Sequence, residues 1–205
     1  MRILIGIPST EDVKADFAMA LATMMGATCA QVQSVQVAVF NAKGCHVDRN
    51  RYWIVKKAQE MEADKILFID SDMVFPPKTL LQLLSHREYI VGVNAVKRTP
   101  PHDALAVGLD GELIDTKADG LVEVSRMGTG IMLVDMKVFT DVKAPWFVNT
   151  YVEGKFDSGD YKFCQEVKAQ GYNIFCDTEL SLQVGHIGST THFPKNGEDD
   201  APDND

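Results

Sequence analysis

Two carboxylates stand close together at the end of an apolar run in the stretch KILFIDSDMVFPP, residues 65–77. Asp70 follows the apolar residues 66–69, and Asp72 comes two positions later, before a pair of prolines. Residues i and i+2 of a strand point the same way, so both acids are expected at one edge of a sheet. Two carboxylates this close repel each other unless a cation lies between them or one is protonated. Such hard oxygen ligands suit Mg2+ or Mn2+, which also take phosphate oxygens and water.

The elements that must position these acids alternate between strand and helix through the first half of the chain. The hydrophobic pattern predicts strands at 2–8, 35–40, 65–70 and 89–95, and helices at 46–63 and 76–86. A further helix is expected between the first two strands, capped by Ser9 or Thr10 and stopped by Gly26. This alternation predicts an α/β fold with a mostly parallel central sheet flanked by helices. Ligands of such sheets bind at the carboxyl ends of the strands, where the two acids stand.

The second half of the chain has a mixed pattern. It predicts a hairpin around Asp110-Gly111, strands and a helix over 121–139, and late strands at 172–177 and 180–188. Residues 158–171 predict an amphipathic helix with Ser158 as its cap. We expect one domain over residues 1–193, followed by an acidic, disordered tail over 194–205.

Composition limits the function classes. The 205 residues carry a net charge of −9, and the last eight residues, EDDAPDND, hold five of those negative charges. The mildly acidic body argues against nucleic-acid binding, which needs a basic face. The four cysteines show no CxxC spacing and are expected as reduced, mostly buried thiols. Neither a signal peptide nor a membrane span is evident, so a cytoplasmic protein is expected.

Several segments, taken in order, resemble the GT-A glycosyltransferases, close to their inverting family 2 group. ILIGIPSTED resembles the opening strand and loop that receive the nucleotide base, and DRNRYWIVKKAQEMEADKILFIDSDM resembles the helix and strand that lead to the DxD motif. MGTGIMLVDMKVF resembles the glycine-containing segment near the acceptor site. SGDYKFCQEVKAQGYNIFCDTELSLQVGHIG resembles the stretch with the catalytic acid and a late histidine. The resemblance implies a metal-dependent enzyme that moves a sugar from a UDP- or GDP-sugar to an acceptor hydroxyl.

The resemblance also implies roles for individual residues. Asp70, Ser71 and Asp72 form the DxD motif, whose acids hold Mn2+ or Mg2+ on the donor diphosphate. His186 matches the late histidine and would be a third metal ligand or a diphosphate contact. Asp160 matches the catalytic base that takes the proton of the acceptor hydroxyl.

Further implied contacts belong to the nucleotide, and one departure affects the base. The base and ribose pocket would be lined by Pro8, Ser9, Thr10 and Glu11. Arg49 would contact the nucleotide or brace that loop. The family often has an acid before the base, but Gly159 stands there, so Asp157 is an alternative base.

Other interpretations of these residues stay open. Asp160 at a helix start can simply be stabilised by the helix dipole, and His186 can be a structural residue. FIDSDMVF also resembles the haloacid-dehalogenase phosphatases, in which Asp70 would be a nucleophile that forms an aspartyl phosphate. A third possibility is a GT-A-like domain that binds a sugar nucleotide without turnover.

Overall fold

The protein is described here from a computed structural model, which covers residues 1–97, 105–114, 120–152, 154–188 and 191–192. The expected acidic tail, 194–205, lies outside the described residues, so the domain boundary at residue 193 stays a prediction. Among the described helices, none is both long and apolar enough to cross a membrane.

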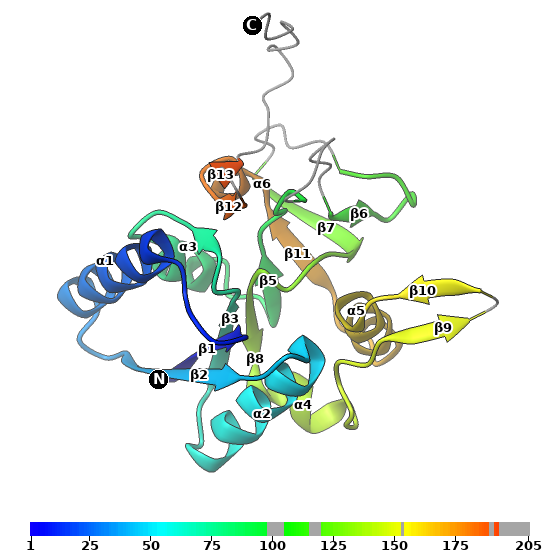
Figure 1. Cartoon of the computed structure of the whole chain (residues 1–205), viewed down its shortest axis with the longest axis horizontal. Helices are drawn as coiled ribbons and strands as arrows, with labels where there is room; N and C mark the ends of the chain where they lie inside the picture. The colour runs from blue at the N-terminus through cyan, green and yellow to red at the C-terminus, as the bar shows by residue number, and fades with distance from the viewer. Residues whose placement is uncertain (98–104, 115–119, 153, 189–190, 193–205) are drawn as a thin grey trace, which may run out of the picture.

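A central eight-stranded sheet organises the molecule (Figure 1). Its strand order is β2-β1-β3-β8-β5-β11-β7-β6. The strands are β1 (Arg2–Ser9), β2 (Gln36–Lys43), β3 (Lys65–Ile69), β5 (Ile90–Gly92), β6 (Val107–Gly108), β7 (Leu121–Arg126), β8 (Ile131–Asp135) and β11 (Ile174–Asp177). The predicted α/β class is confirmed.

The sheet is mixed rather than mostly parallel. β1 pairs in parallel with β2 and β3, and β5 pairs in parallel with β11. β8 lies antiparallel between β3 and β5, and β7 lies antiparallel to both β11 and β6. The hydrophobic pattern could not reveal this, because a strand buried on both faces is continuously apolar whichever way it runs.

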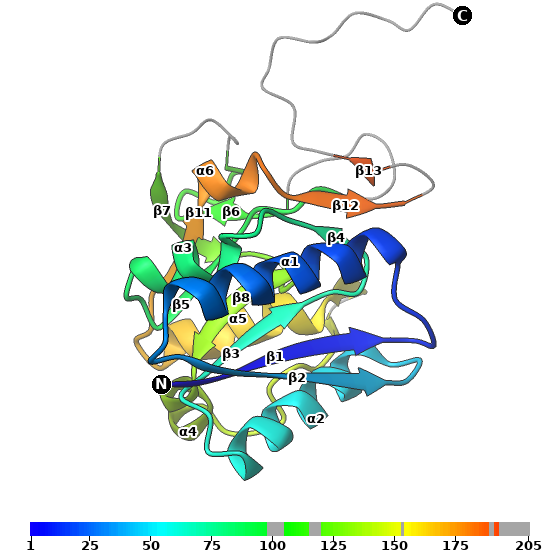
Figure 2. The ribbon, with the colours of Figure 1, turned by 90° about the vertical axis from the view of Figure 1, so that its left-hand side faces the viewer.

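Helices cover both faces of the sheet (Figure 2). On one face, α1 (Ala15–Gln31) and α3 (Thr79–Ser85) pack against one core cluster, which includes Phe17 and Leu80. On the other, α2 (Val47–Glu60), α4 (Met136–Asp141) and α5 (Gly159–Ala169) pack against a second cluster, which includes Ile54 and Phe163. Packing on both faces holds the sheet in place and therefore fixes the positions of the residues at the ends of its strands.

Close packing of α2 on the first strand depends on Gly6. A Cβ atom at this position would lie 2.2 Å from Cγ2 of Ile54, so only glycine lets the helix come this near. Ile54 is fully buried. The packing fixes the rotation of α2 and therefore decides which residues of its first turns face the edge of the sheet.

Smaller elements complete the fold. A three-stranded sheet joins β4 (Met73–Val74), β12 (Gly185–Ile187) and β13 (Thr191–His192). A separate hairpin pairs β9 (Thr150–Val152) with β10 (Lys155–Asp157), and α6 (Thr178–Ser181) follows β11. Residues 180–188 were expected as one strand, but the first of them complete α6 and only 185–187 form a strand. Asp177 explains the break, because its side chain caps α6 by accepting from the backbone N–H of Leu180.

The first helix differs from its prediction at both ends, whereas the predicted turn at Asp110-Gly111 is present. The first helix begins at Ala15 and not after Ser9, which belongs to β1 and donates its hydroxyl to Asn41 Oδ1. The helix runs through Gly26, where an added Cβ would meet nothing. The turn at Asp110-Gly111 is confirmed, with a bridge between Val107 and Leu113.

The four cysteines are free thiols, as expected, but only two of them are buried. Cys29 and Cys45 are exposed. Burial raises the pKa of the Cys164 and Cys176 thiols to about 12. Both buried thiols are therefore protonated at neutral pH and belong to the core.

Candidate functional site

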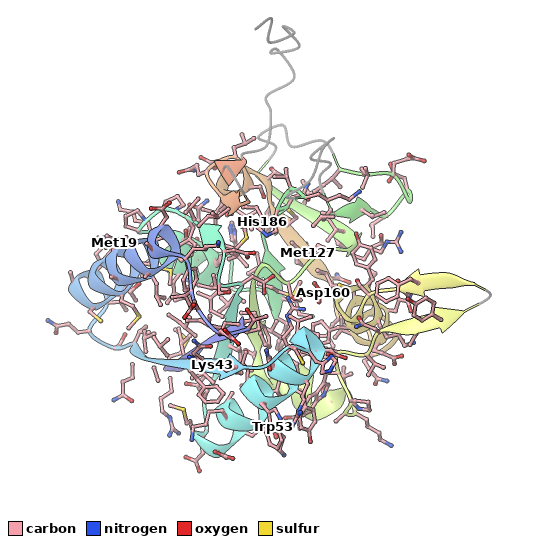
Figure 3. All side chains as sticks on the ribbon, in the orientation of Figure 1. Met19, Lys43, Trp53, Met127, Asp160 and His186 are labelled. Atoms are coloured by element: carbon pink, nitrogen blue, oxygen red, sulfur yellow. The ribbon has the colours of Figure 1, made fainter. Side chains whose placement is uncertain are left out.

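A cavity of about 510 Å3 opens at the carboxyl ends of β1 and β3. The starts of α2 and α5 and the strand β12 complete its walls. Its volume lies in the range of small-molecule sites. The lining residues are Pro8, Ser9, Thr10, Gly44, Cys45, Val47, Asp48, Asn50, Arg51, Asp70, Ser71, Asp72, Asn149, Phe156, Ser158, Gly159, Asp160 and His186. In Figure 3, Asp160 and His186 lie in the middle of the view, whereas Met19 and Trp53 lie at its periphery.

A buried arginine joins two of the predicted acids. Arg51 Nη1 donates to Asp160 Oδ1 at 2.5 Å, and Nη2 donates to Asp70 Oδ1 at 2.9 Å. The Arg51 side chain is only 4% exposed, and its guanidinium lies 5.9 Å from the ring centroid of Phe147. A planar guanidinium with several donors can serve two carboxylates at once. Arg51 therefore fixes the distance between the end of β3 and the start of α5.

The electrostatics of this group follow from burial and charge. Burial raises the pKa of the Asp70 carboxyl, Arg51 opposes the rise, and the charges of Asp160 and Asp72 add to it. For Arg51, burial acts to lower the pKa, but the two carboxylates outweigh it and raise the pKa above its usual value. The guanidinium is therefore always charged, and the surrounding acids hold that charge in place.

Asp160 is held in its position from three directions. Ser158 caps α5 by accepting from the backbone N–H of Tyr161, which places Asp160 in the first turn. The backbone N–H of Thr129, in the glycine-containing segment before β8, donates to Asp160 Oδ2 at 3.1 Å. With the bond from Arg51, both carboxylate oxygens have a protein donor. This carboxylate is oriented before any ligand arrives.

Gly159, directly before Asp160, is closely packed against neighbouring backbone. An added Cβ would lie 3.2 Å from the carbonyl carbon of Phe147 and 3.2 Å from the backbone nitrogen of Val148. The Gly159 N–H donates to Asn149 Oδ1 at 2.8 Å. The backbone before α5 thus passes so near residues 147–149 that a side chain at 159 would be crowded against main-chain atoms.

Asp72 lies beside the predicted late histidine. β12 pairs antiparallel with β4 so that His186 stands opposite Met73, and the Ile187 N–H donates to the carbonyl of Asp72. His186 Nε2 lies 3.4 Å from Asp72 Oδ1. Its Nδ1 lies 2.9 Å from the carbonyl oxygen of Val96, which can only accept. In the neutral ring the proton therefore belongs on Nδ1, and Nε2 presents its lone pair on the side of Asp72.

This donor set suits a divalent cation better than it suits a closed structural metal site. A carboxylate and a neutral imidazole are both accepted ligands of Mn2+, and a backbone carbonyl that fixes the imidazole tautomer is a usual outer partner. Within the described part of the chain, no group of three or more His, Cys, Asp or Glu residues is placed to hold a metal ion. Two of the three predicted ligands, Asp72 and His186, come together, while Asp70 is paired with Arg51.

Three predicted residues lie outside the lining of the cavity. Glu11 is exposed in the segment after β1, and Arg49 is exposed on the first turn of α2. Asp157, the alternative base, accepts from Gln165 Nε2 at 3.0 Å. Beside Arg49, Asn50 is buried and donates to the carbonyls of Ser9 and Gly44, which ties the loops after β1 and β2 together.

Sequence reasoning missed Arg51, although a signal for it exists. Arg51 shares the buried side of α2 with Ile54, Val55 and Ala58, at the i+3, i+4 and i+7 spacing of one helix face. A charged residue on the apolar face of a helix indicates a buried ion pair or a site. Asn149 and Phe156 were also missed, and no local pattern marks them because they belong to a short hairpin and its approach.

Comparison with solved structures shows the same fold. The chain is similar to A197 from STIV, with a TM-score of 0.61 and 16% identity over 92% of this chain and 86% of that chain. It is also similar to Drosophila beta-1,4-galactosyltransferase 7 in a complex with manganese, UDP-Gal and xylobiose, with a TM-score of 0.53 and 11% identity over 91% of this chain and 71% of that chain. No family model matches the chain, and no curated protein matches it. The protein has a fold like that of the nucleotide-diphospho-sugar transferases.

Proposed function

We propose that this protein transfers a sugar from a nucleotide-diphosphate sugar, such as a UDP- or GDP-sugar, to an acceptor hydroxyl with inversion at the anomeric carbon. The observation that carries the proposal is that one cavity holds both an oriented carboxylate, Asp160, and the Asp72–His186 pair. The cavity lies at the strand edge where open α/β sheets bind ligands. A nucleotide-sugar transferase-like fold supports the same chemistry.

Asp72 and His186 are the residues that would hold Mn2+ or Mg2+. When bound, the ion would supply Lewis-acid neutralisation of the charge on the leaving nucleoside diphosphate. In this proposal Asp70 acts mainly as the partner of Arg51. It also adds negative charge next to the cation site.

Asp160 would act as the base. Its carboxylate accepts the proton of the acceptor hydroxyl, whose oxygen then attacks the anomeric carbon from the side opposite the diphosphate. Arg51 and the Thr129 N–H keep this carboxylate in one orientation, so little rearrangement is needed on binding. Pro8, Ser9 and Thr10 would line the nucleotide end of the cavity.

A thermal-shift series tests the donor site directly. UDP, GDP, CDP and their common sugars are added to the full chain with and without Mn2+, because a ligand that binds only the folded state raises its stability by mass action. We expect a shift for one nucleotide, only with Mn2+, that is lost in Asp72→Asn. Glu179→Gln is the matched control, since this exposed acid of α6 does not line the cavity.

Other outcomes separate the alternatives. Metal-dependent binding without release of nucleotide, even when acceptors are supplied, would favour a non-catalytic domain. If no donor shifts the unfolding temperature but beryllofluoride is trapped at Asp70, the phosphatase interpretation gains and the transferase proposal fails.

A further inference from the structure

Two aromatic side chains face solvent as a pair on the β9–β10 hairpin. Tyr151 and Phe156 are direct cross-strand partners, with ring centroids 5.1 Å apart. They are 77% and 56% exposed. Figure 1 shows this hairpin extending from the body of the molecule beside α5. A cross-strand aromatic pair stabilises a hairpin, but it also presents a broad apolar surface to water.

The pair continues into the candidate site. Phe156 lines the cavity together with Asn149, Ser158 and Asp160. The hairpin leads directly into α5, since β10 ends at Asp157 and Ser158 caps the helix that carries Asp160. The aromatic surface therefore lies at the side of the cavity where the proposed base stands. A molecule that brings a hydroxyl to Asp160 has Phe156 beside it.

We propose that Tyr151 and Phe156 form a platform for a carbohydrate acceptor, an assignment that rests on the proposed transferase function. A sugar ring has an apolar C–H face that covers an aromatic ring, while its hydroxyls point outward from its edge. The platform offers aromatic faces, and the adjoining lining offers an amide, a hydroxyl and a carboxylate. A lipid acceptor would require a longer apolar surface, but beyond Phe156 this side of the cavity is polar.

The test measures carbohydrate binding and donor binding on the same variants. The full-length chain is applied to an array of immobilised mono- and oligosaccharides, and the double variant Tyr151→Val with Phe156→Val is compared with wild type. Valine keeps the strand propensity of the hairpin while it removes both rings. We expect wild type to bind at least one carbohydrate and the double variant to bind it about tenfold more weakly or worse. The Mn2+-dependent thermal shift with nucleotide should stay unchanged.

Two further variants control for loss of structure. Tyr151→Phe keeps the ring and should retain carbohydrate binding. Trp53→Leu removes an exposed aromatic that does not line the cavity and should also retain binding. Carbohydrate binding that survives loss of both rings, or capture by arrayed peptides or phosphatidylcholine vesicles in place of carbohydrates, would overturn this inference alone. Absence of any donor shift in wild type would instead count against the proposed function.

Discussion

Asp70 and Asp160 accept hydrogen bonds from the two terminal nitrogens of one guanidinium, that of Arg51. The first acid directly follows the strand β3, and the second lies in the first turn of α5. Arg51 comes from a third element, α2, and carries a further buried N–H, at Nε, for which the described residues offer no hydrogen-bond partner. The ion-paired group therefore joins three elements at the one cavity in which chemistry is proposed.

Removal of the Arg51 charge should strongly destabilise the fold. Arg51→Met leaves two partly buried carboxylates facing each other without a counter-charge, and such a change typically costs about 3–5 kcal/mol of unfolding free energy. The unfolding free energy of Arg51→Lys should lie between those of wild type and Arg51→Met. The lysine keeps the positive charge, but an ammonium cannot span both carboxylates as a guanidinium does. Urea unfolding measures both effects.

The neighbouring arginine offers a matched control for this prediction. Arg49 is exposed on the same helix, so Arg49→Met should change the unfolding free energy by no more than about 0.5 kcal/mol. If Arg51→Met and Arg49→Met lost the same unfolding free energy, the ion pairs of Arg51 would add no more stability than an exposed arginine does.

The Asp70 carboxyl should make stability fall as pH rises. Burial raises its pKa in the folded state above the unfolded value of about 3.9. The stabilisation by its proton is thus complete below the unfolded pKa and is lost as pH rises through the folded pKa. The loss amounts to about 1.4 kcal/mol for each unit between the two pKa values.

Urea unfolding of wild type and of Asp70→Asn over a series of pH values checks this pH dependence of the unfolding free energy. The amide cannot titrate, so the unfolding free energy of wild type should decline relative to the variant over that interval. Glu179→Gln should follow wild type throughout. A wild type that gains stability over the variant as pH rises would mean that Arg51 outweighs burial.

Asp160 and Asp157 should differ sharply in their effect on transfer. Asp160→Asn keeps an oxygen that can accept from the Thr129 N–H but removes the base, so turnover should fall about 100- to 10,000-fold while donor binding persists. Asp157→Asn keeps a partner for Gln165 and should change turnover little. Nucleotide release in the presence of acceptor provides the measurement. The reverse ranking would move the base role to Asp157.

A methyl group at position 159 should destabilise the fold. Gly159→Ala would press its Cβ against backbone atoms of Phe147 and Val148, and overpacking of this kind costs about 1–3 kcal/mol. Gly26→Ala is the contrasting case, since nothing surrounds that position in α1 and the change should stabilise by about 0.5–1 kcal/mol. Thermal unfolding of the two variants should therefore shift in opposite directions, and a stabilised Gly159→Ala would contradict the packing.

Much of the scaffold around the site could be predicted from local pattern. The strand directly before Asp70, the helix capped by Ser158 and the turn at Asp110-Gly111 all follow from signals within a few residues. Capping, turn chemistry and hydrophobic period act over one or two turns of chain, so the sequence carries them directly. The placement of Asp70 and Asp72 at a sheet edge belongs to this class.

The choice between neighbouring residues required the tertiary structure. Whether Arg49 or Arg51 enters the site depends on the rotation of α2, which the contact between Ile54 and Gly6 sets. His186 reaches Asp72 only because β12 pairs with β4 in one register.

The sequence by itself therefore determined the α/β class, the two acids at the strand end and the helix that carries Asp160. Tertiary packing decided the direction of β8, the burial of Arg51 and the aromatic surface beside the cavity. The physical reason is the distance along the chain over which each kind of interaction acts. Local propensities act between near neighbours in the chain, whereas strand order, register and helix rotation arise from contacts between segments that are distant in sequence.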